Sequence, residues 1–129
     1  KTVEKPTTAA VAEAIKPTKP VMKPEMHTEF FYLIGRTVIS QGEQVKFHQL
    51  VKFLTENPDA KVNVVGYADA GTGSSETNAR IARQRAENVA KALQKSAIAV
   101  QRIVTDSKGD TIQPYPENDK NRVTIIVAK

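Results

Sequence analysis

Cysteine is absent from the 129 residues, which excludes disulfides, thiol catalysis and most zinc sites. Aromatic residues make up only 5% of the chain, although the formal net charge is +5. Because nucleic-acid-binding proteins usually combine a basic face with interleaved aromatic side chains, we expect no nucleic-acid partner. No apolar run is long enough to span a bilayer. The apolar and charged fractions, 40% and 26%, are ordinary, so we expect one soluble domain taken from a longer protein.

Residues that could carry catalysis or bind a metal are also few. The two histidines are His27 and His48, and we expect both to be solvated. The loop acids lack the spacing of metal ligands and are explained by turn formation; they are Asp106, Asp110, Glu117 and Asp119. The sequence therefore predicts a protein that is not an enzyme and that holds neither a metal nor a cofactor.

The beginning of the chain differs in composition from the rest. Four prolines, the first Pro6 and the last Pro24, recur among lysines, and the only apolar cluster is short. Repeated proline opposes both helices and strand ladders, so we expect an extended, largely disordered tether over residues 1–28. A folded domain is expected over residues 29–129.

Two sequence features predict a first helix over residues 40–57. Ser40 and Glu43 have the spacing of a capping box, in which each side chain bonds a free backbone N–H at the start of a helix. The apolar face of this helix should consist of residues spaced at i, i+3, i+4 and i+7. These residues are Phe47, Leu50, Val51 and Leu54.

The remaining patterns complete one small domain. A second helix is expected from about Ser74 to Lys95, after a loop rich in glycine. Strands are expected over residues 29–34, 61–66, 101–106 and 121–128, the last with Val123, Ile125 and Val127 alternating. This order predicts an α/β (α+β) fold, with the helices packed on one face of a small mixed sheet.

The glycine-rich loop before the second helix superficially resembles a phosphate site. Gly66, Gly71 and Gly73 precede a helix N-terminus, but the Lys-Ser/Thr pair of a nucleotide-binding loop does not follow them. Asp69 would also direct a carboxylate toward a bound anion. We therefore expect that this loop does not bind phosphate.

One cation lies where the second helix should be apolar. At about 100° per residue, Arg85 and Asn78 fall on the same stripe as Ile81 and Val89. A buried guanidinium needs a partner, because leaving it unpaired costs several kcal/mol. Two arrangements stay open. Asp69 could form an internal salt bridge with Arg85, or the two could face one concavity and bind the ammonium and carboxylate of a zwitterionic amino acid. The pair could also be joined when empty and opened by the ligand.

This region resembles the signature of the OmpA-like peptidoglycan-binding domain, found in outer-membrane protein A, peptidoglycan-associated lipoprotein and flagellar stator subunits. Gly66-Tyr67-Ala68-Asp69, followed by a glycine, is similar to the family form G-H-T-D-x-x-G. Asn78-x-x-Ile81-Ala82-x-x-Arg85-Ala86 is similar to N-x-x-L-S-x-x-R-A. The resemblance covers about residues 29–129, including "FFYLIGRTVI", "KGDTIQP" and the final "NRV". It implies a β-α-β-α-β-β two-layer sandwich.

The resemblance also implies non-covalent binding of cell-wall peptidoglycan through the diaminopimelate of its peptide stem. Asp69 and Arg85 take the positions of the family residues that hold the distal amino and carboxylate groups. The other implied site residues are Gly71, Asn78, Ile81, Ala82, Thr37, Val38 and Arg122. The implied location is the periplasmic side of the outer membrane, with any membrane anchor upstream of this sequence and with other envelope proteins as further partners.

Several polar family positions are filled differently here. Tyr67 and Ala68 stand where the family has histidine and threonine, Ala82 where it has serine, and Val123 where it has a second arginine. An alternative function therefore stays open, namely an OmpA-like protein-interaction module of the cell envelope with weak or no peptidoglycan binding. Binding of diaminopimelate or a muropeptide separates the two functions.

Overall fold

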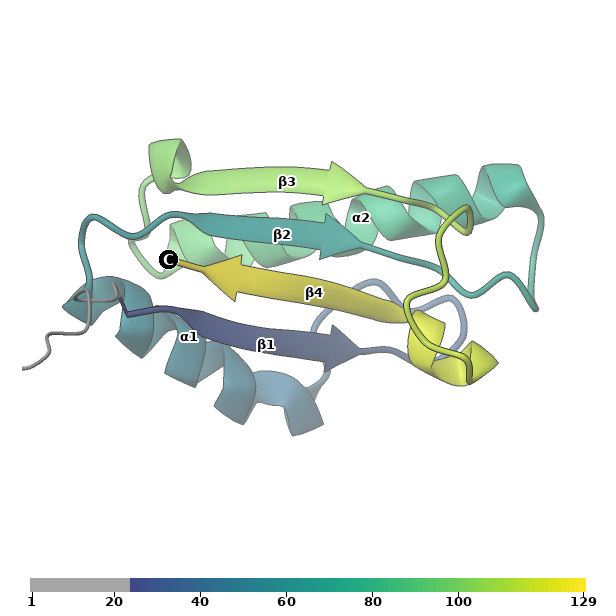
Figure 1. Cartoon of the computed structure of the whole chain (residues 1–129), viewed down its shortest axis with the longest axis horizontal. Helices are drawn as coiled ribbons and strands as arrows, with labels where there is room; N and C mark the ends of the chain where they lie inside the picture. Colours follow the sequence, from purple (N-terminus) through teal and green to yellow (C-terminus); the bar gives the residue numbers. More distant parts are fainter. Residues whose placement is uncertain (1–23) are drawn as a thin grey trace, which may run out of the picture.

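The computed structural model describes residues 24–129, and residues 1–23 lie outside the described part. Four strands form one sheet in the order β1-β4-β2-β3 (Figure 1). β4 is antiparallel to both β1 and β2, whereas β2 and β3 are parallel. The strands are β1 (Met26–Phe31), β2 (Val62–Gly66), β3 (Ile103–Ser107) and β4 (Val123–Ala128); the α-helices are α1 (Gln44–Glu56) and α2 (Ser75–Lys95); the 3-10 helices are η1 (Gln41–Glu43), η2 (Val100–Arg102) and η3 (Asn118–Asn121).

Both α-helices lie on one face of the sheet, which confirms the predicted α+β fold (Figure 1). α1 packs mainly against β1, and α2 packs against β2 and β3. The apolar face predicted for α1 is largely buried, because three of its four residues, Phe47, Leu50 and Leu54, belong to the core. The opposite wall of this core is the inward face of the strands, with Phe30 and Val64 fully buried.

The last strand alternates between two faces, as predicted. Thr124, Ile126 and Ala128 are fully buried beneath the helices, whereas Ile125 and Val127 lie half-buried on the open face of the sheet. β4 is flanked by β1 and β2, so both of its edges are paired. This central position explains why even the outward face of β4 is largely apolar.

The first strand lies earlier in the sequence than predicted. β1 covers Met26–Phe31 instead of residues 29–34, so it extends into the segment that we assigned to the tether. A tight turn shortens its far end, since the Arg36 N–H donates to the Leu33 carbonyl at 3.0 Å and Gly35 has a φ of 73°. The rest of the predicted tether lies outside the described residues and stays a prediction.

The predicted capping box is wrong. Ser40 makes no side-chain bond to the helix, and η1 forms before α1 begins. Glu43 turns to the edge of β1 instead, where it accepts a hydrogen bond from the Phe31 N–H at 2.7 Å and pairs with Lys46 at 3.0 Å. Lys46 also donates to the Glu29 carbonyl at 2.7 Å. The start of α1 is thus fastened to the edge strand.

Side chains satisfy the other helix ends. The Ser74 hydroxyl accepts a hydrogen bond from the Thr77 N–H at 3.2 Å, so α2 begins where predicted with a true N-cap. Arg102 of η2 donates to the carbonyls of Leu54 and Asn57, both at 2.8 Å, where α1 ends. Within residues 24–129, neither α-helix combines the length and hydrophobicity that crossing a membrane requires.

Candidate functional site

Three loops meet at one end of the sheet: β1–α1, β2–α2 and β3–β4 (Figure 1). The first two loops and the start of α2 enclose a cleft of about 230 Å³. The residues that line it are Ile34 and Gly35 from the first loop, Ala68, Asp69, Thr72 and Gly73 from the second, and Thr77, Asn78, Ile81 and Arg85 from α2. The cleft therefore contains both charged residues that the sequence singled out.

A close contact between β2 and α2 positions this cleft. A Cβ atom on Gly66 would overlap the backbone carbonyl of Ala82, so the end of β2 can touch the helix only because residue 66 is glycine. Ala82 is fully buried in this contact and does not line the cleft. The contact brings Arg85, one turn further along α2, over the chain that leaves β2.

Arg85 is buried and forms no salt bridge with an acid of residues 24–129. The residue is 1% exposed, and its guanidinium donates from Nε to the Arg36 carbonyl and from Nη1 to the Tyr67 carbonyl, both at 2.8 Å. The Tyr32 ring lies under it, with the ring centroid 4.7 Å from Cζ. Burial lowers the pKa of Arg85 to about 10, so the side chain stays cationic at neutral pH. No residue in the described range 24–129 accepts a hydrogen bond from Nη2.

Asp69 is held by a separate set of partners. Its carboxylate, 3% exposed, accepts hydrogen bonds from the Thr72 hydroxyl at 2.8 and 2.9 Å and from the Asn118 amide at 2.9 Å. The cation paired with it is Arg122, whose Nη1 lies 3.8 Å away. Burial raises the pKa of Asp69, but these hydrogen bonds and the Arg122 charge outweigh it, so the pKa is lower than usual. The internal salt bridge between Asp69 and Arg85 is therefore not formed.

Asn78 fixes the β2–α2 loop from inside the cleft. Its side-chain amide donates to the backbone carbonyls of Asp69 and Thr72, at 3.2 and 2.7 Å, and to the Asp110 carboxylate at 3.1 Å. Gly73, which has a φ of 70°, lies directly against this amide. The loop is therefore rigidly attached to the first turn of α2.

The sequence assigned Gly71 to the cleft, but the glycine that lines it lies two positions later. Three residues separate Asp69 from Gly73, where the family form has two, and Gly73 rather than Gly71 lines the cleft. Gly71 faces the β3–β4 loop, where its N–H donates to Asn118 at 2.9 Å. A Cβ atom on Gly71 would clash with that side chain.

Sequence reasoning missed four residues that build the site. They are Tyr32 and Thr72, described above, and two residues of the β3–β4 loop, Gln113 and Asn118. Gln113 accepts a hydrogen bond from the Ala70 N–H at 3.0 Å and donates to the Ala68 carbonyl at 2.9 Å. No sequence pattern predicts the contacts of Gln113 and Asn118, because their partners are more than 40 residues away and several are backbone groups. Thr72 lies only three residues after Asp69, a local spacing that could have indicated the contact.

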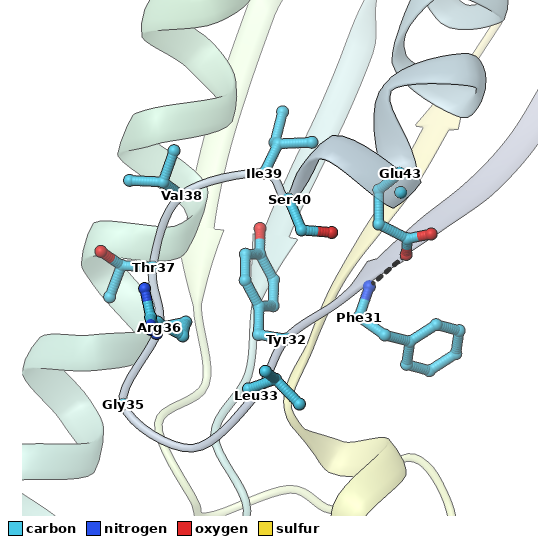
Figure 2. Close-up of a pocket in the computed structure, with 11 residues that line it drawn as sticks. Phe31, Tyr32, Leu33, Gly35, Arg36, Thr37, Val38, Ile39, Ser40 and Glu43 are labelled. Atoms are coloured by element: carbon cyan, nitrogen blue, oxygen red, sulfur yellow. Dashed lines mark hydrogen bonds between the residues drawn. The ribbon is translucent and has the colours of Figure 1, made fainter.

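Two further predicted residues, Thr37 and Val38, line a neighbouring hollow instead of the cleft. This hollow has a volume of about 910 Å³ and lies inside the curve of the β1–α1 loop (Figure 2). α2 holds the loop from behind, since Asn88 donates to the Thr37 carbonyl at 2.9 Å. The residues around the hollow are Phe31, Tyr32, Leu33, Gly35, Arg36, Thr37, Val38, Ile39, Ser40, Gly42 and Glu43.

Metal-binding groups do not gather in the described part of the chain. Among residues 24–129, no three His, Cys, Asp or Glu side chains are close enough to hold an ion. His27 lies in β1 rather than in a tether and contacts Glu25 at 2.7 Å, while His48 is exposed on α1. The cleft can therefore supply charge and hydrogen bonds to a ligand from its own side chains.

Comparison with known sequences adds independent information. A model of the OmpA family matches residues 31–124. Outer membrane protein 40 of Porphyromonas gingivalis is 31% identical over 117 residues, which cover 90% of this chain and 30% of that protein. Probable lipoprotein YiaD of Escherichia coli is 43% identical over 56 residues, which cover 43% of this chain and 25% of that protein. The chain thus spans less than a third of the length of these relatives.

Solved structures share the fold at lower sequence identity. The peptidoglycan-associated lipoprotein from Burkholderia pseudomallei has a TM-score of 0.72 at 20% identity, with 78% of this chain and 89% of that chain covered. The C-terminal domain of Helicobacter pylori MotB has a TM-score of 0.66 at 23% identity, covering 79% and 84%. Fold and sequence profile agree over most of the described residues, and the chain belongs to the OmpA family.

Proposed function

We propose that this domain binds cell-wall peptidoglycan without forming a covalent bond and without catalysis. Its ligand is the diaminopimelate side chain of the peptide stem, whose distal end carries both an ammonium and a carboxylate. Asp69 accepts the ammonium, and the guanidinium of Arg85 donates to the carboxylate. The cleft between them is about 230 Å³, a size suited to the end of one amino acid rather than a whole muropeptide.

One observation carries this proposal: two opposite charges line one cleft and are not paired with each other. Arg85 is satisfied on two sides by backbone carbonyls, which do not neutralise its charge. Burying such a charge is costly unless an anion joins it at some stage of the protein's function. A ligand carboxylate supplies that anion. It can also accept hydrogen bonds from Nη2 of Arg85, which donates to no residue within 24–129.

The relatives support a role in the cell envelope. They are named as outer membrane proteins and as a lipoprotein, and one solved neighbour is named peptidoglycan-associated. We extend the proposal to location: the domain lies on the periplasmic side of the outer membrane and holds that membrane to the wall. The residues before β1, which begins at Met26, would then act as a tether between an upstream anchor and the domain.

Isothermal titration with stem peptides tests the site. The diaminopimelate residue should lie within the peptide, so that its proximal amino and carboxyl groups are in peptide bonds and only the distal end is zwitterionic. Asp69→Asn and Arg85→Lys should each weaken binding by roughly 2 to 4 kcal/mol, because Asn removes the charge that faces the ligand ammonium and Lys keeps its charge but cannot form the paired hydrogen bonds of a guanidinium to the ligand carboxylate. The matched control is Arg83→Lys, an exposed position on the same helix, which should bind as the wild type. Full affinity in both site variants would refute the proposal.

A second function is favoured by the apolar surface beside the cleft. Leu33, Ile34 and Val38 of the β1–α1 loop are 72, 63 and 67% exposed, and two of them border the large hollow (Figure 2). Exposed apolar clusters of this kind often mark protein contacts. The domain could then act as an interaction module for another envelope protein. Absence of stem binding at millimolar concentration, in a natively folded sample, would favour this function.

A further inference from the structure

We propose that the Thr72 hydroxyl occupies, in the empty cleft, the position of the ligand ammonium on Asp69, so that Thr72 is an internal competitor that sets affinity and amino-group selectivity. This inference rests on the proposed function and concerns the same site. It assigns a role to a residue that lines the cleft and bonds only within it.

The first observation is the geometry of the contact. The Thr72 oxygen lies 2.9 Å from Oδ1 and 2.8 Å from Oδ2 of Asp69, so the hydroxyl bridges both carboxylate oxygens. A hydroxyl has a single proton and can serve one oxygen at a time, whereas an ammonium has three protons and a full charge. Thr72 is therefore a weaker donor in a position that suits a stronger one.

The second observation is that Asn118 and Arg122 flank the rest of the carboxylate. A carboxylate offers roughly four lone-pair positions. Asn118 donates to Oδ2 at 2.9 Å, and Nη1 of Arg122 lies 3.8 Å from Oδ1. With Asp69 only 3% exposed, an incoming ammonium has no other way to both oxygens than through the position of Thr72.

The third observation concerns how Thr72 can leave. Its backbone is fixed, because Asn78 donates to its carbonyl at 2.7 Å and the neighbouring Gly71 N–H donates to Asn118 at 2.9 Å. Release is therefore a rotation about the Cα–Cβ bond of Thr72, without opening of the loop. Valine has the same shape as threonine and no hydroxyl, so Thr72→Val removes the competing bond and keeps the packing.

The competition makes the cleft selective. A ligand that brings an ammonium replaces a neutral hydrogen bond with a charge-assisted one and gains from the exchange. A ligand with only the distal carboxylate can bind Arg85 and leave Thr72 in place. Removing the hydroxyl should therefore strengthen binding of the first ligand and leave the second unchanged.

Isothermal titration with two stem peptides tests this inference, one with diaminopimelate and one with 2-aminopimelate, which lacks the distal amino group. For the diaminopimelate stem, Thr72→Val should bind roughly threefold to tenfold more tightly than the wild type, the range expected for loss of one competing hydrogen bond. For the 2-aminopimelate stem the two proteins should be equal. Thr72→Ser restores the hydroxyl and should return the affinity to the wild-type level. Thr55→Val, the same change on the surface of α1, is the matched control.

The outcomes distinguish a failure of this inference from a failure of the proposed function. If the wild type binds the diaminopimelate stem and Thr72→Val binds it equally or more weakly, Thr72 positions Asp69 instead of competing, and only this inference fails. If the wild type binds neither stem, the proposed function fails and the inference fails with it. An equal gain for both stems would show that Thr72 blocks the cleft sterically and would also overturn the role assigned here.

Discussion

At the scale of single residues, Arg85 illustrates how a small domain can hold a charge inside without an opposite charge. Backbone carbonyls satisfy two sides of the guanidinium and the Tyr32 ring covers one face, so its geometry is fixed while its charge is not neutralised. A fixed, desolvated fork of donors suits a carboxylate, because little reorganisation is needed on binding. Asp69 is fixed by a separate set of contacts, and the two charges can therefore bind one ligand.

Asn118 provides a prediction at this scale. Asn118→Ala removes one of the hydrogen bonds that lower the pKa of Asp69, so that pKa should rise. Because the Asp69 carboxylate has a lower pKa in the folded than in the unfolded state, its ionisation stabilises the fold at pH values above the unfolded-state pKa. This stabilisation is lost as the pH falls through the folded-state pKa. The variant should therefore be about 1 kcal/mol less stable at neutral pH and should lose less stability on acidification.

NMR titration of Asp69 and urea unfolding at neutral and acidic pH measure these effects. Asn63→Ala, an exposed asparagine on the open face of β2, is the control and should change neither. An unchanged pKa of Asp69 in Asn118→Ala would contradict the role of this contact.

The sequence predicted which two charged residues would meet in one cleft but not what holds them there. Helical geometry placed Arg85 and Asn78 on a buried stripe, and Asp69 was the acid of the loop that leads into this helix, because these features depend on local spacing. The partners of Arg85 are carbonyls of Arg36 and Tyr67, 49 and 18 residues away, whose side chains take no part in the contact. A backbone acceptor has no residue-type signature, so the sequence could not show that Arg85 pairs with carbonyls instead of forming a salt bridge with Asp69.

At the scale of elements, the contact between β2 and α2 offers a matched pair of glycine substitutions. Gly66→Ala places a methyl group onto the Ala82 carbonyl and must push strand and helix apart. We therefore expect the free energy of unfolding to fall by about 1–3 kcal/mol. Gly42→Ala in η1 meets no atom within 4 Å and should be nearly neutral. Equal unfolding midpoints in denaturant for the two variants would show that this contact does not hold the helix.

The serines before the two helices provide a second matched pair of substitutions. Ser74 caps α2 through its side chain, whereas Ser40 makes no such bond. Ser74→Ala should cost about 1 kcal/mol and Ser40→Ala only a few tenths at most. Thermal unfolding of both variants measures the difference, and a larger loss for Ser40→Ala would restore the capping box that the structure contradicts.

The bounds of α2 were predicted more accurately than the start of α1 or the ends of β1. α2 begins and ends within a residue of its predicted bounds, since an N-cap and a long amphipathic face are local signals. The capping box failed because the edge of β1 competes for Glu43, a contact between segments that no helical pattern contains. β1 was misplaced for the same reason: its register is set by pairing with β4, almost 100 residues later.

At the scale of the whole molecule, the order of strands and helices allowed the two-layer fold to be predicted, but the sheet order β1-β4-β2-β3 was not part of that prediction. This order leaves the ends of β1, β2 and β3 at one side of the domain (Figure 1). There the loops after β1 and β2 and the start of α2 enclose the cleft. The same end carries the apolar β1–α1 loop. Peptidoglycan and a protein partner would therefore approach the domain from the same side.

The central claim is that the cleft binds the zwitterionic end of diaminopimelate. Isothermal titration of the 129-residue chain with two stem peptides, identical except for diaminopimelate or lysine at one position, tests it most directly. Lysine keeps the distal amine and lacks the distal carboxylate, so Arg85 has no anion to bind. We predict that the diaminopimelate stem binds at least tenfold more tightly, and that a hundredfold excess over its Kd stabilises the fold by about 2.7 kcal/mol. Equal affinity for the two stems, or no binding of either at millimolar concentration, would contradict the claim.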